Sequence, residues 1–154
     1  MLDELLSEAE LLGVFVTEFP FKTKRLKALY TDGVITFNSS ADFVEYEKLC
    51  ALSEELGHHY TSAGNILDQS DIRKRKQELR ARQWGYQRLI PLSSIVQAYG
   101  TGAKCRYEIA DFLGVTEEFL QAAIDRYSEK YGVFTTMDNY IIFFEPLRVI
   151  EVLT

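Results

Sequence analysis

Leu52-Ser-Glu-Glu-Leu-Gly-His-His-Tyr-Thr61 is the stretch of this 154-residue sequence around which its fold can be worked out. In a helix with about 100° between successive residues, Glu54 and His58 lie one turn apart, about 40° from each other around the axis. Leu52 and Leu56 fall on the opposite face. The stretch therefore predicts a helix that packs through its leucines and presents two side chains able to bind one metal ion.

The spacing of the charged side chains in this helix has a chemical meaning. Two ligands at positions i and i+4 with a carboxylate between them form the His-Glu-x-x-His arrangement, in which the carboxylate takes a proton from a metal-activated water. Here Glu54 replaces the first histidine, and Glu55 is the carboxylate between the ligands. The string Glu-Glu-x-x-His is common in helices, so on its own it also fits a solvated acidic face.

A second predicted helix, at about residues 73–89, offers a third ligand. It places Ala81 and Gly85 on roughly the same face as Glu78, and such small residues allow two helices to approach closely. Glu54, His58 and Glu78 together give three protein ligands and leave a fourth position open for water, as a catalytic zinc site requires. The alternative is that Glu78 is one exposed acid in a strongly charged segment.

Three further side chains near the motif have open roles. Glu55 and His59 are also four residues apart, but His59 lies nearer the leucine face, which favours a packed histidine that supports a ligand. Tyr60 and Tyr86 could each donate a hydrogen bond to a developing oxyanion, or could be core or boundary aromatics.

The segment before the motif helix predicts a helix and a small sheet. Residues 2–12 have the apolar spacing of an amphipathic helix. Asp32-Gly33 is a strong signal for a hairpin, and we expect an antiparallel sheet. The motif helix itself is expected at about residues 41–60, capped by Ser39 or Ser40. The extended runs of the sheet are 14–18, 26–30 and 34–38, and a loop is expected at 61–71.

Beyond Pro91 the sequence predicts short helices and a final hairpin with Asp138-Asn139 as its turn. The last two helices have the pattern of a helix-turn-helix, with the hairpin as a wing. The helical runs are 94–99, 105–113 and 116–131, and the extended runs are 133–137 and 140–144. The third helix carries more acids than bases, which is the wrong sign for contact with DNA phosphates. These residues are Glu117, Glu118, Asp125 and Glu129 against Arg126 and Lys130.

The bulk composition limits the classes of function. The chain is long enough for one ordinary domain with its own core. Its net charge of −6 argues against nucleic acid as a partner. Cys50 and Cys105 have no metal-binding spacing, the N-terminus is acidic, and no apolar run approaches the roughly 18 residues of a membrane span. We therefore expect a cytoplasmic protein with no membrane or nucleic-acid partner.

Three pieces of the sequence, in this order, resemble the ImmA/IrrE metallopeptidase family, in particular its phage and mobile-element members. They are Leu29 to Ile35 (Leu-Tyr-x-Asp-Gly-x-Ile), Leu52 to Thr61, and Glu78 to Gly85 (Glu-x-x-Ala-x-x-Trp-Gly). The resemblance covers residues 28–91 strongly and the C-terminal part loosely. One difference is Glu54, where many members have histidine.

The resemblance implies a zinc-dependent endopeptidase. By position, its metal ligands would be Glu54, His58 and Glu78, and its general base Glu55. Zn²⁺ is the implied cofactor, and Mn²⁺ is an alternative because two carboxylates suit a harder ion. The implied partner is a protein substrate, a helix-turn-helix repressor of a phage or mobile element. Its chain could pair with an exposed edge of the 34–38 strand.

The expected fold is α+β, with its two regions packed as one unit. Residues 1–91 form a zincin-like catalytic region with a small antiparallel sheet and the metal-site helices, and residues 92–154 form a helix-turn-helix-like region with a β-hairpin. Two other functions stay open. A catalytically silent relative that binds the repressor is favoured by Glu54 in place of histidine, and a winged-helix DNA-binding module is disfavoured by the acidic third helix.

Overall fold

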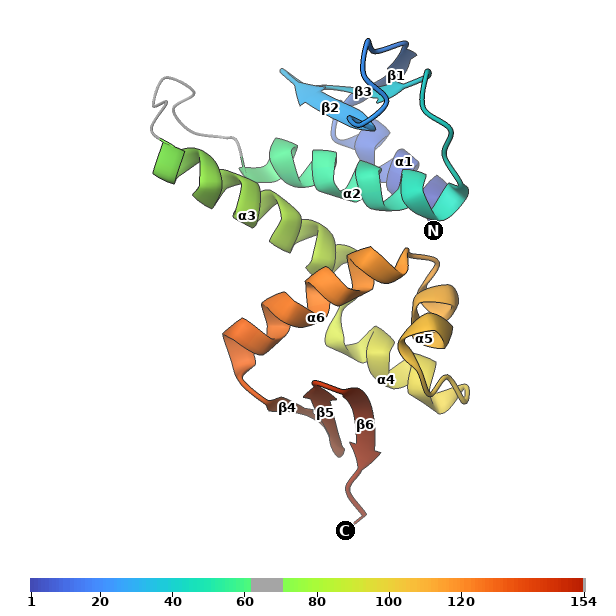
Figure 1. Ribbon diagram of the computed structural model, residues 1–154, viewed down its shortest axis with the longest axis vertical. Coiled ribbons are helices and arrows are strands. Elements are labelled where there is room, and N and C mark those ends of the chain that lie inside the picture. Colours follow the sequence, from blue (N-terminus) through green and yellow to red (C-terminus); the bar gives the residue numbers. More distant parts are fainter. Residues whose placement is uncertain (62–70, 154) are drawn as a thin grey trace. The chain divides into compact units, whose positions relative to one another are not determined.

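The computed structural model describes residues 1–61 and 71–153 and has the α+β fold expected from the sequence (Figure 1). The chain divides into two compact units, Met1–Gly85 and Tyr86–Thr154. The boundary lies inside helix α3 (Asp71–Leu89), earlier than the division after residue 91 that the sequence suggests. The interior of the predicted loop at 61–71 lies outside the described residues.

The first unit combines a small sheet with helices that pack against it. Ile35 and Phe37 of the central strand are buried on the face that meets the helices, together with Leu5 of the first helix and Leu52 and Leu56 of the second. Besides most of α3, its elements are α1 (Leu2–Leu11), β1 (Phe15–Phe19), β2 (Ala28–Thr31), β3 (Val34–Asn38) and α2 (Glu45–Thr61).

The sheet has the strand order β1-β3-β2 and is mixed, so the expectation of an antiparallel sheet is wrong for one pair. β2 and β3 form the expected hairpin, and Asp32 and Gly33 both have positive φ, as a tight two-residue turn requires. The chain reverses between β1 and β2, and again between β2 and β3. Two reversals return the chain to its original direction, so β1 and β3, which are neighbours in the sheet, run parallel.

The central position of β3 also corrects the expected substrate edge. β3 pairs with a strand on each side, so residues 34–38 have no open edge for a further chain. The edge strands of this sheet are β1 and β2. A peptide that adds to the sheet beside α2 would have to pair with β2, which is the edge strand that contacts that helix most.

Asn38 fixes the connection between β1 and β2. Its side chain is fully buried, and its amide nitrogen donates to the carbonyl oxygens of Thr23 and Leu26 at 2.7 and 2.8 Å. Its Oδ1 accepts from the backbone N–H groups of Phe21 and Ser40, both at 3.0 Å. One side chain therefore satisfies three backbone groups of a connection that has no regular structure of its own, and a fourth just after β3.

Helix α2 begins later than expected. It starts at Glu45, so the predicted capping role of Ser39 or Ser40 is wrong. Ser40 Oγ instead donates to the carbonyl oxygen of Phe21 at 3.0 Å, which ties it to the loop that Asn38 organises. The Ser40 hydroxyl is therefore bound to the loop between β1 and β2, and residues 41–44 precede α2 without being helical.

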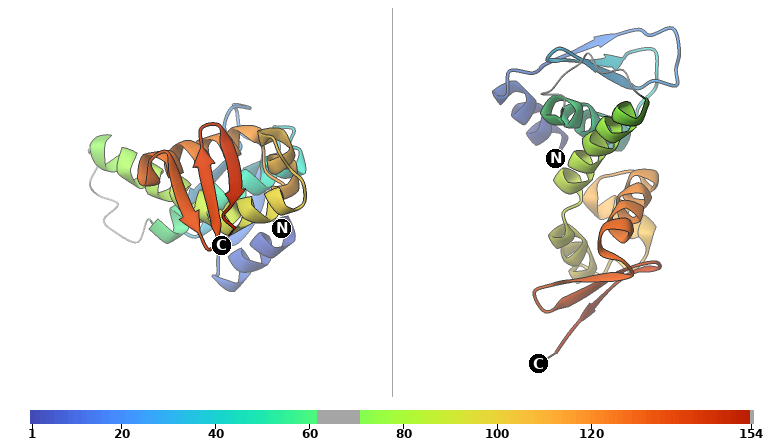
Figure 2. Two further views of the ribbon diagram at one scale, coloured as in Figure 1. Left: turned by 90° about the horizontal axis from the view of Figure 1, so that it is seen from below. Right: turned by 90° about the vertical axis from the view of Figure 1, so that its left-hand side faces the viewer.

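The second unit packs α6 and α4 against one face of a three-stranded antiparallel sheet, which Figure 2 (left) shows face on. Ile142, Phe144 and Val149 are the buried side chains of that face. Tyr127 of α6 is buried with them, and its hydroxyl donates to the carbonyl oxygen of Ile90 at 2.7 Å. The elements are α4 (Leu92–Gly100), α5 (Arg106–Leu113), α6 (Glu117–Tyr131), β4 (Phe134–Met137), β5 (Tyr140–Phe144) and β6 (Leu147–Glu151).

Strand β6 is absent from the sequence-based expectation, which ends at the hairpin of β4 and β5. Its residues alternate, with Val149 buried and Arg148 and Ile150 exposed, over a run too short to stand out. Among the described residues, no helix combines the length and the apolar character needed to cross a membrane.

Asn38→Ala should lower the free energy of unfolding by about 2–4 kcal/mol, because three backbone groups of the loop lose the side chain that hydrogen-bonds them. Urea denaturation measures this. Asn139→Ala is the matched control, since that side chain makes one exposed hydrogen bond in a hairpin turn and should change stability by less than about 0.5 kcal/mol. Equal stabilities of the two variants would contradict the role given to Asn38.

Candidate metal site

Helices α2 and α3 touch where their small residues meet. A methyl group on Gly57 would collide with the carbonyl group of Ala81, so only glycine fits at this point of α2. At Gly85, a Cβ atom would lie 3.0 Å from Oγ of Ser53. Ala81 and Ser53 are both fully buried. The close approach expected from Ala81 and Gly85 is confirmed, and it determines which side chains of the two helices can meet.

Two pairs of charged side chains join the helices beside this contact. Nε2 of His58 lies 3.5 Å from Oε2 of Glu78. Nε of Arg82 donates to Oε1 of Glu54 at 3.2 Å. Glu54 and His58 are one turn apart on α2, and Glu78 and Arg82 are one turn apart on α3, so the two pairs lie next to each other. All three predicted ligands therefore lie along the α2–α3 contact.

The neighbouring residues of α2, Glu55 and His59, meet strand β2 instead. The hydroxyl of Tyr30 and Nδ1 of His59 share a hydrogen bond of 2.8 Å, and the two rings meet edge to face with their centroids 5.6 Å apart. The backbone N–H of Tyr30 donates to the carboxylate of Glu55. The pair Glu54 and His58 therefore contacts α3, whereas the neighbouring pair Glu55 and His59 contacts Tyr30 of the edge strand β2.

Glu55 has surroundings that favour its protonated form. Burial raises its pKa most, the negative charge of Glu54 raises it further and that of Glu78 adds a smaller effect, while the N–H of Tyr30 lowers it, so that the pKa is about 7. A carboxyl group with a pKa in this range can take up and release a proton near neutral pH.

Tyr30 and Arg82 are site residues that the sequence analysis does not single out. Tyr30 stands in the hairpin piece of the resemblance, but nothing in the sequence says which strand lies against α2. Arg82 follows Glu78 by four residues and so shares its helix face, a spacing that could have identified it. Within a segment this rich in cations, however, the spacing alone does not show which one meets Glu54.

The two tyrosines considered as oxyanion donors have packing partners. Tyr60 stacks on Trp84 with ring centroids 4.6 Å apart, and its hydroxyl donates to Oε1 of Glu8 at 3.3 Å. Tyr86 is buried in the second unit, where its ring meets Phe119 edge to face at 5.2 Å. These contacts describe packed aromatics, and an oxyanion role for either stays a prediction.

The donors along the α2–α3 contact fit a zinc ion in chemical type, since zinc accepts imidazole nitrogen and carboxylate oxygen and three such ligands leave one position open. In position they fit in part. His58 and Glu78 already meet, whereas Glu54 is bound to the guanidinium of Arg82. Within residues 1–61 and 71–153, no three His, Cys, Asp or Glu side chains are grouped as a finished metal site. In this structure the Oε1 atom of Glu54 is bound to Arg82 instead of lying with His58 and Glu78 in one group.

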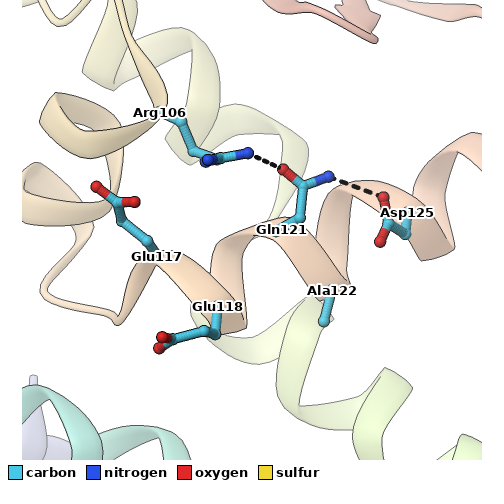
Figure 3. A pocket seen from close by; sticks show the side chains of 6 residues that line it. All are labelled: Arg106, Glu117, Glu118, Gln121, Ala122 and Asp125. Carbon is cyan, nitrogen blue, oxygen red and sulfur yellow. Dashed lines mark hydrogen bonds between the residues drawn. The ribbon is translucent and has the colours of Figure 1, made fainter.

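The second unit carries a hollow of a different character, lined mainly by α6 (Figure 3). Arg106 donates to the side-chain oxygen of Gln121. The amide nitrogen Nε2 of Gln121 donates in turn to Oδ1 of Asp125 at 2.8 Å. The remaining lining residues are Glu117, Glu118 and Ala122. Three carboxylates beside one guanidinium make this part of α6 acidic, on the helix that a winged-helix protein would place against DNA phosphates.

Comparison with known families gives one match. A family model described as Peptidase_M78, the IrrE N-terminal-like domain, matches residues 9–125, which include α2, α3 and all the site residues named above. A comparison with curated proteins gives no match. The matched residues cover well over half of the chain, and the resemblance inferred from the three sequence pieces is confirmed.

Gly57→Ala should lower the free energy of unfolding by about 1–3 kcal/mol, because the added methyl group collides with backbone of α3 that has no room to move. Chemical denaturation measures the change. Gly100→Ala is the control: that residue ends α4 with nothing within 4 Å of the new methyl group, so the variant should be as stable as the parent or slightly more stable. If Gly57→Ala behaves like Gly100→Ala, the helices are not in contact at Gly57.

Proposed function

The chain belongs to the IrrE N-terminal-like family, Peptidase_M78, and we propose that it is a metal-dependent endopeptidase. The observation that carries the proposal is the pair formed across the helix contact, with Nε2 of His58 3.5 Å from Oε2 of Glu78. An imidazole and a carboxylate from two helices meet there, one helical turn from the third proposed ligand, Glu54. Glu54, His58 and Glu78 would hold the ion, with Zn²⁺ as the first candidate and Mn²⁺ as the second.

A bound ion would supply an acidified water as the nucleophile and would polarise the carbonyl group of the substrate. Glu55 is the residue we assign to the proton. It follows Glu54 directly on α2, is close enough to Glu54 and Glu78 to feel their charges, and is held by the N–H of Tyr30. Its carboxylate takes the proton from the attacking water and can pass it to the leaving amine nitrogen, so that the peptide bond is cleaved by addition of one water.

The substrate would bind as an extended chain beside β2. β2 is an edge strand, and it contacts the helix that carries Glu55. An extended peptide can add to such an edge through main-chain hydrogen bonds. As the substrate we propose a helix-turn-helix repressor, on the strength of the resemblance to phage and mobile-element members alone.

A silent repressor-binding protein is the second candidate. The observation that favours it is the hydrogen bond between Glu54 and Arg82, because the carboxylate that replaces the usual histidine already has a cationic partner. The two candidates differ in metal content. A silent relative would stay metal-free when supplied with zinc or manganese.

The first test is the metal content of the protein prepared without chelators. We expect near-stoichiometric zinc or manganese, and loss of most of it in Glu54→Ala, His58→Ala and Glu78→Ala, since each variant removes one of three ligands. Elemental analysis measures this, and Glu118→Ala, an exposed acid of the second unit, is the control that should keep the metal. Glu55→Gln should also keep the metal but lose repressor cleavage. A protein that takes up no metal at any concentration tried would contradict the enzyme proposal.

Glu54→His should raise the affinity for zinc, because imidazole is a softer ligand than carboxylate and restores the arrangement that many members of the family have. Isothermal titration calorimetry of the metal-free parent and variant, at equal pH and salt, gives the two dissociation constants. Unchanged or weaker binding by the variant would remove Glu54 from the set of ligands.

A further inference from the structure

The ion pair between Arg82 and Glu54 brings a fixed cation to the metal site. Arg82 donates from Nε to Oε1 of Glu54 at 3.2 Å. It lies one turn beyond Glu78 on α3, just as Glu54 lies one turn before His58 on α2. The guanidinium of Arg82 therefore lies beside the side chains that would hold a metal ion.

We infer that Arg82 stands in for the metal cation at Glu54 and that an incoming ion has to displace it. This inference rests on the proposed function, because it concerns the same ligands. A carboxylate beside two other acids is unfavourable when no cation is near, and Glu54 is next to Glu55 in the chain and one helical turn from the pair formed by His58 and Glu78. Arg82 relieves that repulsion while the ion is absent, and its hydrogen bond holds Glu54 away from His58 and Glu78.

The exposure of the pair makes it suited to release. The side chain of Arg82 is 55% exposed and that of Glu54 35% exposed, so both can be rehydrated when the pair opens. Exposed pairs of this kind are weak and are screened by salt. Arg82 therefore competes with the ion without blocking it, and the competition should change metal affinity by about two- to fivefold.

The other cations of α3 provide a control. Arg80 is also exposed and has the same charge, but it stands two residues before Arg82 and thus on nearly the opposite face of the helix. Arg80→Gln removes one positive charge from α3 without touching the pair. Any general effect of net charge on cation binding will appear in this variant, and only the specific effect will be confined to Arg82→Gln.

The experiment is a calorimetric zinc titration of metal-free wild type, Arg82→Gln and Arg80→Gln at low and at high sodium chloride concentration. We expect Arg82→Gln to bind zinc about two- to fivefold more tightly than wild type at low salt and Arg80→Gln to bind like wild type. The difference should shrink at high salt, because screening weakens the pair in wild type alone. Circular dichroism establishes that each variant is folded.

A second readout needs no comparison of affinities. In the ¹⁵N-resolved NMR spectrum of the metal-free protein, the Nε–H signal of Arg82 should be shifted from that of Arg80 by its hydrogen bond, and zinc should move it toward the Arg80 position. Equal zinc affinity of wild type and Arg82→Gln, with an Arg82 signal that zinc leaves unchanged, would overturn the inference and leave the metal site intact. Absence of zinc binding in all three proteins would overturn the proposed function as well.

Discussion

The contact between Gly57 and Ala81 is the constraint on which the candidate site depends. Because the backbones of α2 and α3 approach so closely there, side chains within one turn of Gly57 and Ala81 can meet across the contact. His58 reaches Glu78 and Glu54 reaches Arg82 for that reason. The two helices bring these side chains together directly. Their close approach depends on two glycines, Gly57 and Gly85, that take no part in the chemistry.

Glu54 is the position at which this chain departs from the arrangement that the family favours. A histidine there would be neutral and would give no reason for a cation opposite it. A carboxylate adds a negative charge beside Glu55 and Glu78, and this carboxylate forms an ion pair with Arg82 on the facing helix. Glu54 and Arg82 thus form one electrostatic unit, in which the extra negative charge is matched by a cation on the facing helix.

The sequence predicted the elements better than their connections. Periodicity located the helices, and Asp32-Gly33 located the hairpin, because these signals depend on local spacing and on backbone conformations open to few residues. The parallel pairing of β1 with β3 depends on how residues 20–27 return, and the buried side chain of Asn38 ties that segment to the end of β3, a contact that no local pattern reveals. The same limit applies to the site: the ligand candidates follow from i, i+4 spacing, whereas Tyr30 and Arg82 are defined by contacts between elements.

Tyr30 connects the edge strand to the site helix through both of its polar groups. Its N–H is bound to Glu55 and its hydroxyl to His59. The strand cannot move away from the helix without freeing both partners at once, so local opening of β2 and release of these two side chains are a single cooperative event. A chain that added to this edge would lie beside the one residue that contacts both the carboxylate and the imidazole.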